Sequence, residues 1–282
     1  MQKRWRYSLY LLILVGYYSW ILLSPALFSK STSANNREVT ITGHRGAAGY
    51  APENTLASIQ KALELGVDRI EIDIHQSKDD VVVVLHDESV DRTTDGKGII
   101  AEMTFDEIRQ LDAGEYFSAK FKGEKIPSLE EVLLLVNGQC DLLIEFKNGN
   151  DHYPQIEEHV IELLKKYNAV DWCIVHSFNT KVLVRLHQKI PSLRLHKLFI
   201  VQFRYTPLYF DLGFEKFDPL EYPYIEEYSI NEYFGNIEII DRLQKMGKKV
   251  NIWTLNDPKT INAYKNLGVD GIISDYPDLI QR

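Results

Sequence analysis

Segments with β-strand character alternate with helical segments along most of this chain, and that order limits its fold more than any other feature. Eight short apolar runs have the composition of strands, and apolar residues at helical spacing follow most of them. The strands begin at Val39, Arg69, Leu142, Cys173, Leu195, Tyr228, Val250 and Gly271. Strands that are separated by helices form parallel sheets, so eight such units predict an α/β fold, a (β/α)₈ TIM barrel.

The stretch from Glu71 to Asp87 combines a strand, a polar turn and a returning strand. Isoleucines alternate with Glu71 and Asp73, so both carboxylates are expected on one face of the first strand. A turn centred at residues 79–80 would place Asp73 opposite His86. A hairpin with a solvated polar face is the alternative, but the flanking isoleucines and valines favour burial on both sides.

Polar side chains gather where the first three strands end. His44 follows strand one, Glu71 and Asp73 lie on strand two, and Glu145 and Lys147 end strand three. In a barrel of this type the active site lies at the carboxyl ends of the strands. Three clustered carboxylates repel one another without a cation, and their oxygens suit Ca²⁺ or Mg²⁺. We therefore predict that Glu71, Asp73 and Glu145 bind one divalent cation.

The remaining groups suit chemistry on a phosphate ester. Arg45 offers a planar guanidinium for phosphate oxygens, and Lys147 offers a compact positive charge, although an ion pair of Lys147 with Glu145 is the alternative. His44 and His86 are candidates for general acid and general base, because a histidine titrates near neutral pH. A lone buried histidine is more often structural, but two beside a carboxylate site favour catalysis.

Together these motifs resemble the glycerophosphodiester phosphodiesterase family, over residues 40–282 and in the same order. The matching pieces are His44-Arg45-Gly46, Pro52-Glu53-Asn54-Thr55, Glu71-x-Asp73, His86-Asp87, Arg92-Thr93-Thr94, Glu145-x-Lys147, Ser177-Phe178, Trp253-Thr254 and the run from Asp270 to Asp275. The resemblance implies a phospholipase-C-like barrel, a divalent cation, and hydrolysis of a glycerol phosphodiester to an alcohol and glycerol phosphate. It also implies that both matching histidines, His44 and His86, are catalytic.

Two other functions remain open. A lysophospholipase-D-type enzyme would act on lysophospholipids in a membrane, and the many aromatic rings of residues 199–234 could hold an acyl chain, although core packing would explain them equally well. A non-catalytic protein that binds phosphorylated headgroups is the rival from another class, but it would need no proton-transferring histidines. Trp253, at the end of strand seven, is either a wall of the substrate site or part of the core.

The N-terminus differs from the rest of the chain. Residues 7–29 carry no charge and are long enough to cross ~30 Å of hydrocarbon as a helix. We therefore expect a membrane anchor at residues 1–30, a linker at 31–38, and the barrel at 39–282 with an insertion at 88–126. Basic residues before the apolar run favour a single-pass protein with its catalytic domain outside the cytoplasm, and a cleaved signal peptide would make it secreted.

Charge and cysteine content exclude two classes of function. The net charge of −8 argues against nucleic-acid binding, which needs a basic surface. Cys140 and Cys173 are the only cysteines, too few for a disulfide scaffold or a zinc cluster. The partner that the sequence favours is therefore a small phosphodiester.

Overall fold

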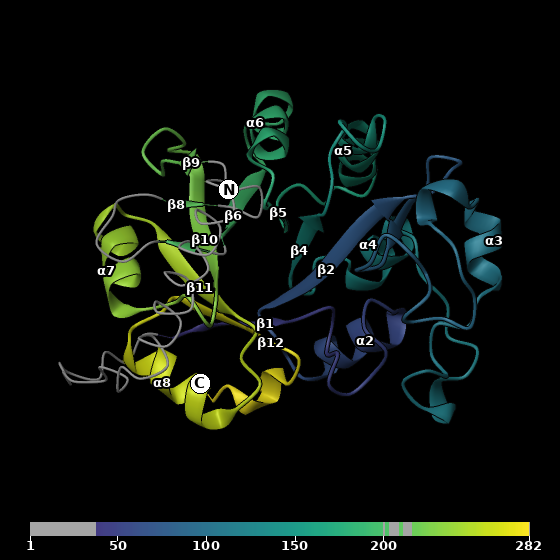
Figure 1. Cartoon of the computed structure of the whole chain (residues 1–282), viewed down its shortest axis with the longest axis horizontal. Helices are drawn as coiled ribbons and strands as arrows, with labels where there is room; N and C mark the ends of the chain where they lie inside the picture. Colours follow the sequence, from purple (N-terminus) through teal and green to yellow (C-terminus); the bar gives the residue numbers. More distant parts are fainter. Residues whose placement is uncertain (1–37, 200, 203–208, 211–215, 282) are drawn as a thin grey trace, which may run out of the picture. The chain divides into compact units, whose positions relative to one another are not determined.

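Eight parallel strands close into a barrel in the computed structural model, which describes residues 38–199, 201–202, 209–210 and 216–281 (Figure 1). The strands are β1 (Thr40–Gly43), β2 (Arg69–Gln76), β4 (Asp141–Phe146), β5 (Cys173–Ser177), β6 (Arg194–Phe199), β10 (Ile225–Asn231), β11 (Lys249–Trp253) and β12 (Gly271–Ser274). β1 pairs with β12 on one side and with β2 on the other, which closes the ring. The predicted barrel is confirmed, although β10 begins at Ile225 rather than at Tyr228.

Helices follow most of these strands and cover the outside of the barrel. They are α2 (Leu56–Glu64), α4 (Leu129–Val136), α5 (Ile156–Lys166), α6 (Thr180–Lys189), α7 (Ile237–Lys245) and α8 (Pro258–Asn266). Thr55 and Ser128 begin α2 and α4 with capping boxes, which satisfy backbone N–H groups that the first turn of a helix leaves free. Ile70, Ile72 and Ile74 of β2 are fully buried in the core that packs against these helices. The alternate residues of β2 therefore face the interior of the barrel.

The hairpin partner of β2 is the short antiparallel strand β3 (Val82–Val84). Ile74 pairs with Val84, and the backbone N–H of Leu85 donates to the carbonyl of Asp73 at 3.1 Å. The predicted pairing of Asp73 with His86 is therefore wrong by one residue, because the turn lies slightly earlier in the chain than its acidic centre suggested.

Residues 88–126 follow β3 and pack against the hairpin. They contain the helix α3 (Phe105–Gln110) and two short 3₁₀ segments, Ile100–Glu102 and Ala119–Phe121. Their apolar side chains form a cluster of their own with residues of the hairpin: Val83, Leu85, Val90, Ile100, Ile108, Ala113 and Ile126. A third 3₁₀ segment, Pro277–Leu279, follows β12, and β7 (Val201–Gln202), β8 (Tyr209–Phe210) and β9 (Lys216–Phe217) form a small antiparallel sheet.

Charged and amide side chains also fill the barrel interior near the start of β2. Arg69 donates to Glu227 at 3.0 Å, and Asn251 donates to the same carboxylate at 3.0 Å. All three side chains are buried, so the pair is shielded from water. The interior of the barrel is thus closed by an ion pair at this level, and the space for a ligand lies nearer the carboxyl ends of the strands.

The prediction of a membrane-spanning segment has to be corrected. Within the ranges that the structure describes, no helix is long and apolar enough to cross a membrane. The longest helix there, α5, has 11 residues, whereas a span needs ~20. The prediction concerned residues 7–29, which lie outside the described residues. The single-pass anchor and the location outside the cytoplasm that depended on it are therefore not retained.

Candidate active site

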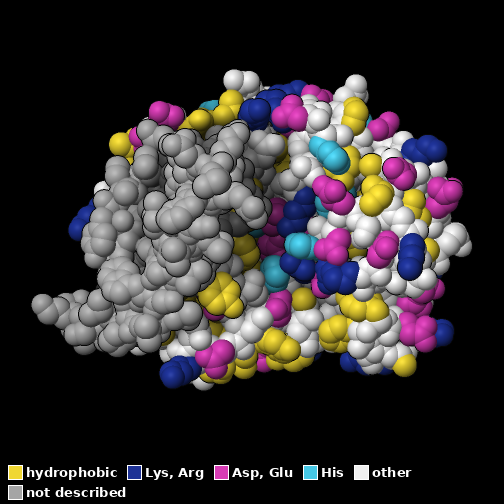
Figure 2. Space-filling view, in the orientation of Figure 1, with side chains coloured by type: hydrophobic (Ala, Val, Ile, Leu, Met, Phe, Trp, Pro, Cys, Tyr) yellow, Lys and Arg dark blue, Asp and Glu magenta, His cyan; other side chains and the backbone are white. Residues whose placement is uncertain are grey.

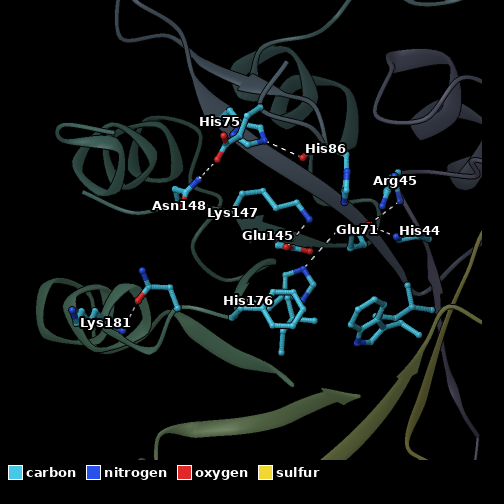
Figure 3. A pocket seen from close by; sticks show the side chains of 16 residues that line it. His44, Arg45, Glu71, His75, His86, Glu145, Lys147, Asn148, His176 and Lys181 are labelled. Atoms are coloured by element: carbon cyan, nitrogen blue, oxygen red, sulfur yellow. Dashed lines mark hydrogen bonds and ion pairs between the residues drawn. The ribbon is translucent and has the colours of Figure 1, made fainter. Parts of the chain in front are cut away.

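A cavity of about 690 Å³ opens at the carboxyl ends of the barrel strands. Figure 2 shows basic, acidic and histidine side chains gathered around this hollow, and Figure 3 shows them at close range. The cavity is lined by His44, Arg45, Glu71, His75, His86, Glu88, Glu145, Lys147, Asn148, His176, Phe178, Asn179, Lys181, Leu198, Trp253 and Ile273. Seven of the eight residues predicted for the site therefore lie on one cavity. Asp73 is buried just behind its wall.

Glu71 and Glu145 stand on neighbouring strands and are almost completely buried. Burial and the negative charges of Asp73 and Glu71 raise the pKa of Glu145 above its ordinary value, even though Lys147 opposes the shift. Glu71 accepts a hydrogen bond at Oε2 from the backbone N–H of Arg45 at 2.8 Å. Two buried carboxylates that repel each other are stabilised by a positive charge placed between them.

Asp73 has positive or amide partners at both oxygens. Lys147 Nζ contacts Oδ1 at 2.7 Å, Asn54 donates to Oδ2 at 2.8 Å, and Arg45 Nε lies 3.4 Å from the same atom. Burial alone would raise the pKa of Asp73, but Lys147 and Arg45 hold it well below its usual range. Asp73 therefore positions the two basic side chains that were predicted to bind phosphate.

His176 belongs to the same cluster, although no sequence motif pointed to it. It lies on β5 directly beside Glu145 of β4, and its Nε2 is 3.7 Å from Oε1 of Glu71. Candidate ligand atoms of Glu71, Glu145 and His176 all lie within 4.8 Å of one another. In Figure 3 the His176 ring points toward the two carboxylates. The signal that could have found it is its position in the fourth strand, level with Glu145.

His44 is held in the turn that follows β1. Its Nδ1 lies 2.6 Å from Oδ1 of Asp275, and its Nε2 lies 4.0 Å from Glu71. Burial lowers the pKa of His44, but the contact with Asp275 and the charge of Glu71 together raise it above its ordinary value. The turn depends on Gly46, which has φ +86° and where a Cβ would lie 2.5 Å from the backbone of Ser58.

His86 is held in the same way by its neighbour. Its Nδ1 lies 2.6 Å from Oδ1 of Asp87, and its backbone carbonyl accepts a hydrogen bond from Nε2 of His75 at 3.0 Å. Because that nitrogen donates, Nδ1 of His75 accepts from the hydroxyl of Tyr153 at 2.8 Å. Burial lowers the pKa of His75, so it acts here as a neutral support for His86.

A chain of ion pairs connects the surroundings of the two histidines. Arg92 donates to Asp87 at 2.7 Å and to Glu53 at 2.8 and 2.9 Å, and Glu53 also accepts from Arg45 at 2.7 Å. The hydrogen bonds from Arg92 lower the pKa of Asp87 to about 2, so that carboxylate stays charged beside His86. Arg92 was noted as part of a motif but was not predicted for the site.

The opposite wall of the cavity is apolar. Phe178 and Trp253 meet edge to face with ring centroids 6.0 Å apart. Ser177 fixes the backbone behind Phe178, because its hydroxyl donates to the carbonyl of Phe146 at 2.8 Å and accepts from the N–H of Asn179 at 3.0 Å. The cavity thus has a charged side and an aromatic side, which suits a small molecule with a phosphate and a less polar part.

Comparisons with known proteins show the family to which the chain is similar. Residues 44–279 match the model of the glycerophosphoryl diester phosphodiesterase family. A glycerophosphodiester phosphodiesterase of Caldanaerobacter subterraneus subsp. tengcongensis is 38% identical, over 85% of this chain and 95% of the relative. One from Bacillus subtilis is 30% identical, over 100% of this chain and 98% of the relative.

A solved structure gives the same result. An Oleispira antarctica phosphodiesterase in complex with the product sn-glycerol-3-phosphate superposes with a TM-score of 0.76 at 29% identity, over 89% of this chain and 98% of that one. The match of the family model covers most of the chain, and the barrel and its cavity carry the residues through which the sequence resembles this family. The chain belongs to the glycerophosphoryl diester phosphodiesterase family and is a phosphoric diester hydrolase.

Proposed function

We propose that this enzyme hydrolyses glycerophosphodiesters, such as glycerophosphocholine or glycerophosphoethanolamine, to glycerol phosphate and the free alcohol. The observation that carries the proposal is the pair of histidine–aspartate contacts, His44 with Asp275 and His86 with Asp87, at a single cavity. Glycerol phosphate is the product bound to the related phosphodiesterase of Oleispira antarctica, which supports the same product here.

Arg45 and Lys147 are suited to bind the phosphate. Both basic side chains line the cavity, and Asp73 holds both from behind. Phosphoryl transfer spreads negative charge over the non-bridging oxygens, so fixed positive charges that face those oxygens lower the barrier. Asp73 contributes by keeping Arg45 and Lys147 in place before the substrate arrives.

The carboxylates that lie between His176 and the basic side chains of Arg45 and Lys147 are suited to hold a divalent cation. Glu71 and Glu145 offer carboxylate oxygens, and Oε1 of Glu71 is buried with no hydrogen-bond partner among the described residues. Asp73 stays a predicted third carboxylate ligand, and Ca²⁺ or Mg²⁺ stay the predicted ions. When bound, such a cation would neutralise charge on the phosphoryl oxygens.

His44 and His86 are suited to move the protons. One takes the proton of the attacking oxygen, and the other gives a proton to the oxygen of the leaving alcohol. Each ring is held at Nδ1 by an aspartate, which leaves Nε2 as the atom for transfer. The aspartates also stabilise the imidazolium that forms during the reaction, since they place a negative charge 2.6 Å from the ring.

Trp253 and Phe178 are suited to contact the less polar part of the substrate. They form the aromatic wall that faces the charged groups. A lysophospholipid would place an acyl chain there or at residues 203–208, which lie outside the described residues. Lysophospholipid hydrolysis therefore stays an alternative prediction, and no contact among the described residues favours it over soluble glycerophosphodiesters.

A panel of phosphodiesters tests the proposal. The full chain would be incubated with glycerophosphocholine, glycerophosphoethanolamine and a lysophospholipid, with Ca²⁺, with Mg²⁺ and with a chelator. Phosphorus NMR should show glycerol phosphate from the soluble substrates. Binding without turnover on any substrate would instead identify a headgroup-binding protein, and turnover of the lysophospholipid alone would identify the lipid-directed enzyme.

A further inference from the structure

Glu88 is a carboxylate of the cavity wall that has no positively charged partner. Its Oε1 accepts a hydrogen bond from the side-chain amide of Asn148 at 3.0 Å. Both residues line the cavity, and within the described residues no lysine, arginine or histidine nitrogen lies within 4.0 Å of the Glu88 carboxylate. Burial lowers the pKa of His75, so that neighbouring ring brings no charge to this wall. Glu88 therefore adds a negative charge that nothing nearby neutralises.

The other acidic side chains around the cavity have basic partners or belong to the proposed cation site. Lys147 contacts Glu145 at 2.6 Å, and Arg92 contacts Asp87 at 2.7 Å. A phosphodiester is an anion, so a fixed carboxylate beside its binding site repels it and weakens binding. This loss is offset only for a substrate that brings a positive charge to the carboxylate, which makes such a residue selective.

The backbone on both sides of this contact is held in place. The carbonyl of Glu88 accepts a hydrogen bond from the N–H of Ile100 at 2.9 Å. Asn148 precedes Gly149, where a Cβ would lie 2.4 Å from Cγ2 of Val182, so the chain there packs closely against α6. Groups that are fixed before a ligand arrives lose little conformational entropy when it binds.

The Glu88–Asn148 pair lies next to the groups proposed for phosphate binding and proton transfer. Glu88 follows His86 by two residues, and Asn148 directly follows Lys147. In Figure 3, Asn148 lies across Lys147 from Arg45. Consecutive Cα atoms are ~3.8 Å apart, so the pair is within reach of a group carried two carbons beyond the ester oxygen of a bound phosphate. The ammonium of an ethanolamine headgroup stands at that position.

We propose that Glu88 and Asn148 bind the ammonium group of the substrate's alcohol, and that the enzyme prefers headgroups with a primary ammonium. This inference rests on the proposed function, because it concerns the headgroup of the same substrate. A primary ammonium donates three hydrogen bonds, and the Glu88 carboxylate and the amide oxygen of Asn148 are suited to accept them. The quaternary ammonium of choline donates none and is bound chiefly by the faces of aromatic rings, which this pair does not supply.

Substrates that differ only in the headgroup test the inference. The full chain would be given glycerophosphoethanolamine, glycerophosphocholine or glycerophosphoglycerol, and kcat/KM would be measured from the release of glycerol phosphate. We expect the highest value for the ethanolamine ester. Glu88→Gln should lower that value about tenfold, as expected for the loss of a hydrogen bond between charged groups. The value for the neutral glycerol ester should change by less than about twofold, and the choline ester should lose less than the ethanolamine ester.

Glu102→Gln is the matched control, because Glu102 is an exposed carboxylate of the segment 88–126 that is absent from the described lining of the cavity. Its headgroup preference should equal that of the wild type. Asn148→Ala is a second test variant, since it removes the other acceptor and should shift the preference in the same direction by a smaller factor.

Equilibrium binding gives a readout that does not depend on turnover. Calorimetric titration of a full chain with both His44→Ala and His86→Ala would give the Kd of each ester without hydrolysis. Adding Glu88→Gln to this chain should raise the Kd of glycerophosphoethanolamine about tenfold and leave that of glycerophosphoglycerol nearly unchanged.

The outcomes separate the inference from the proposed function. Equal losses on the three esters in Glu88→Gln, or an unchanged preference, would overturn the ammonium site and leave phosphodiester hydrolysis intact. A wild-type chain that releases no glycerol phosphate would overturn the proposed function, and the Kd values would then decide the ammonium site. A rise for the ethanolamine ester alone would support that site, and equal Kd values with and without Glu88→Gln would refute it.

Discussion

Arg92 and Glu53 meet through two parallel hydrogen bonds, Nη1 to Oε2 at 2.9 Å and Nη2 to Oε1 at 2.8 Å. The same guanidinium binds Asp87, the partner of His86, and Glu53 also binds Arg45. A residue of the segment 88–126 thus connects a candidate proton-transfer group to a candidate phosphate-binding group. Such a bidentate contact fixes orientation as well as distance.

Arg92→Ala should therefore lower turnover more than stability. Arg92 is 46% exposed, and exposed ion pairs contribute only ~0–1 kcal/mol to the free energy of unfolding. The loss of support for His86 and Arg45 should lower kcat about tenfold, because a small misplacement of catalytic groups is costly. Arg109→Ala is the control, since Arg109 pairs with Glu131 at 3.1 Å away from the cavity. Equal losses in both variants would contradict a positioning role for Arg92.

His44→Ala and His86→Ala should each lower kcat by ~10²–10⁴, the usual effect of losing a general acid or base. The double variant should lose much less than the product of the two, because the histidines serve one reaction. In a p-nitrophenyl phosphodiester the leaving group is p-nitrophenolate, which needs no proton from a general acid. Steady-state kinetics with this substrate therefore identify the acid, because the variant that regains turnover is the one that lost it. Near-normal turnover in either variant would remove that histidine from the mechanism.

Removal of the cation should abolish activity. Glu71→Gln and Glu145→Gln each replace a charged ligand with an amide and should lose metal and turnover together, with little change in thermal unfolding. Asp73→Asn should also weaken metal binding and lose turnover, because Asp73 is the predicted third carboxylate ligand and the shared anchor of Arg45 and Lys147. Elemental analysis and initial rates in chelator measure both effects. A wild-type enzyme that is fully active in chelator and contains no metal would refute this prediction.

The carboxylate of Glu227 should make the free energy of unfolding fall in acid. Burial alone would raise the pKa of Glu227, but His196 and Arg69 hold it well below the usual value. Its folded pKa therefore lies below its unfolded pKa of about 4.3, so its stabilising effect is complete above that pH and is lost as the pH falls further. Glu227→Gln should lose roughly 3 kcal/mol at pH 7, because Arg69 stays buried with only the more distant carboxylate of Asp141, at 4.0 Å, to pair with.

Urea unfolding at several pH values measures this effect. The difference in the free energy of unfolding between wild type and Glu227→Gln should shrink as the pH drops from 5 toward 3. Parallel curves for the two proteins across that range would show that the carboxylate of Glu227 titrates alike in the folded and unfolded chains.

Trp253→Ala should weaken substrate binding. Trp253 lines the cavity on the side opposite the charged groups, so its loss should raise KM with little change in kcat, the result expected when contact is made equally in substrate and transition state. Trp172→Ala is the control, since Trp172 packs against the outer core and is absent from the described lining. A fall in kcat at unchanged KM would mean that Trp253 acts on the reacting groups instead.

Much of the fold could be predicted because local pattern and global structure agree. Strands such as Ile70–Ile74 are apolar enough to signal burial, and helices such as Leu129–Val136 carry their own capping residues. The barrel follows from counting these units. The hairpin register could not be predicted to the residue, because the acidic turn at Asp79 and Asp80 fits two centres equally well.

The site could be predicted where its residues cluster in the sequence, as Glu71 and Asp73 do. His176 and the pairing of His44 with Asp275 depend on contacts between distant strands. Strand spacing alone does not say which buried histidine lies level with Glu145, since that requires the register of β4 against β5. Nor does it say that Asp73 turns toward Lys147 and Asn54.

The pairing of β1 with β12 has a consequence for how the enzyme is made. His44 and Asp275 are separated by 231 positions in the sequence, and the strands that carry them are the first and last of the barrel. On the ribosome, β1 emerges well before β12 and cannot pair with it until residues 271–274 have been synthesised. Full support for His44 therefore arises only after Asp275 has been synthesised, so chains that stop before that residue lack this part of the active site.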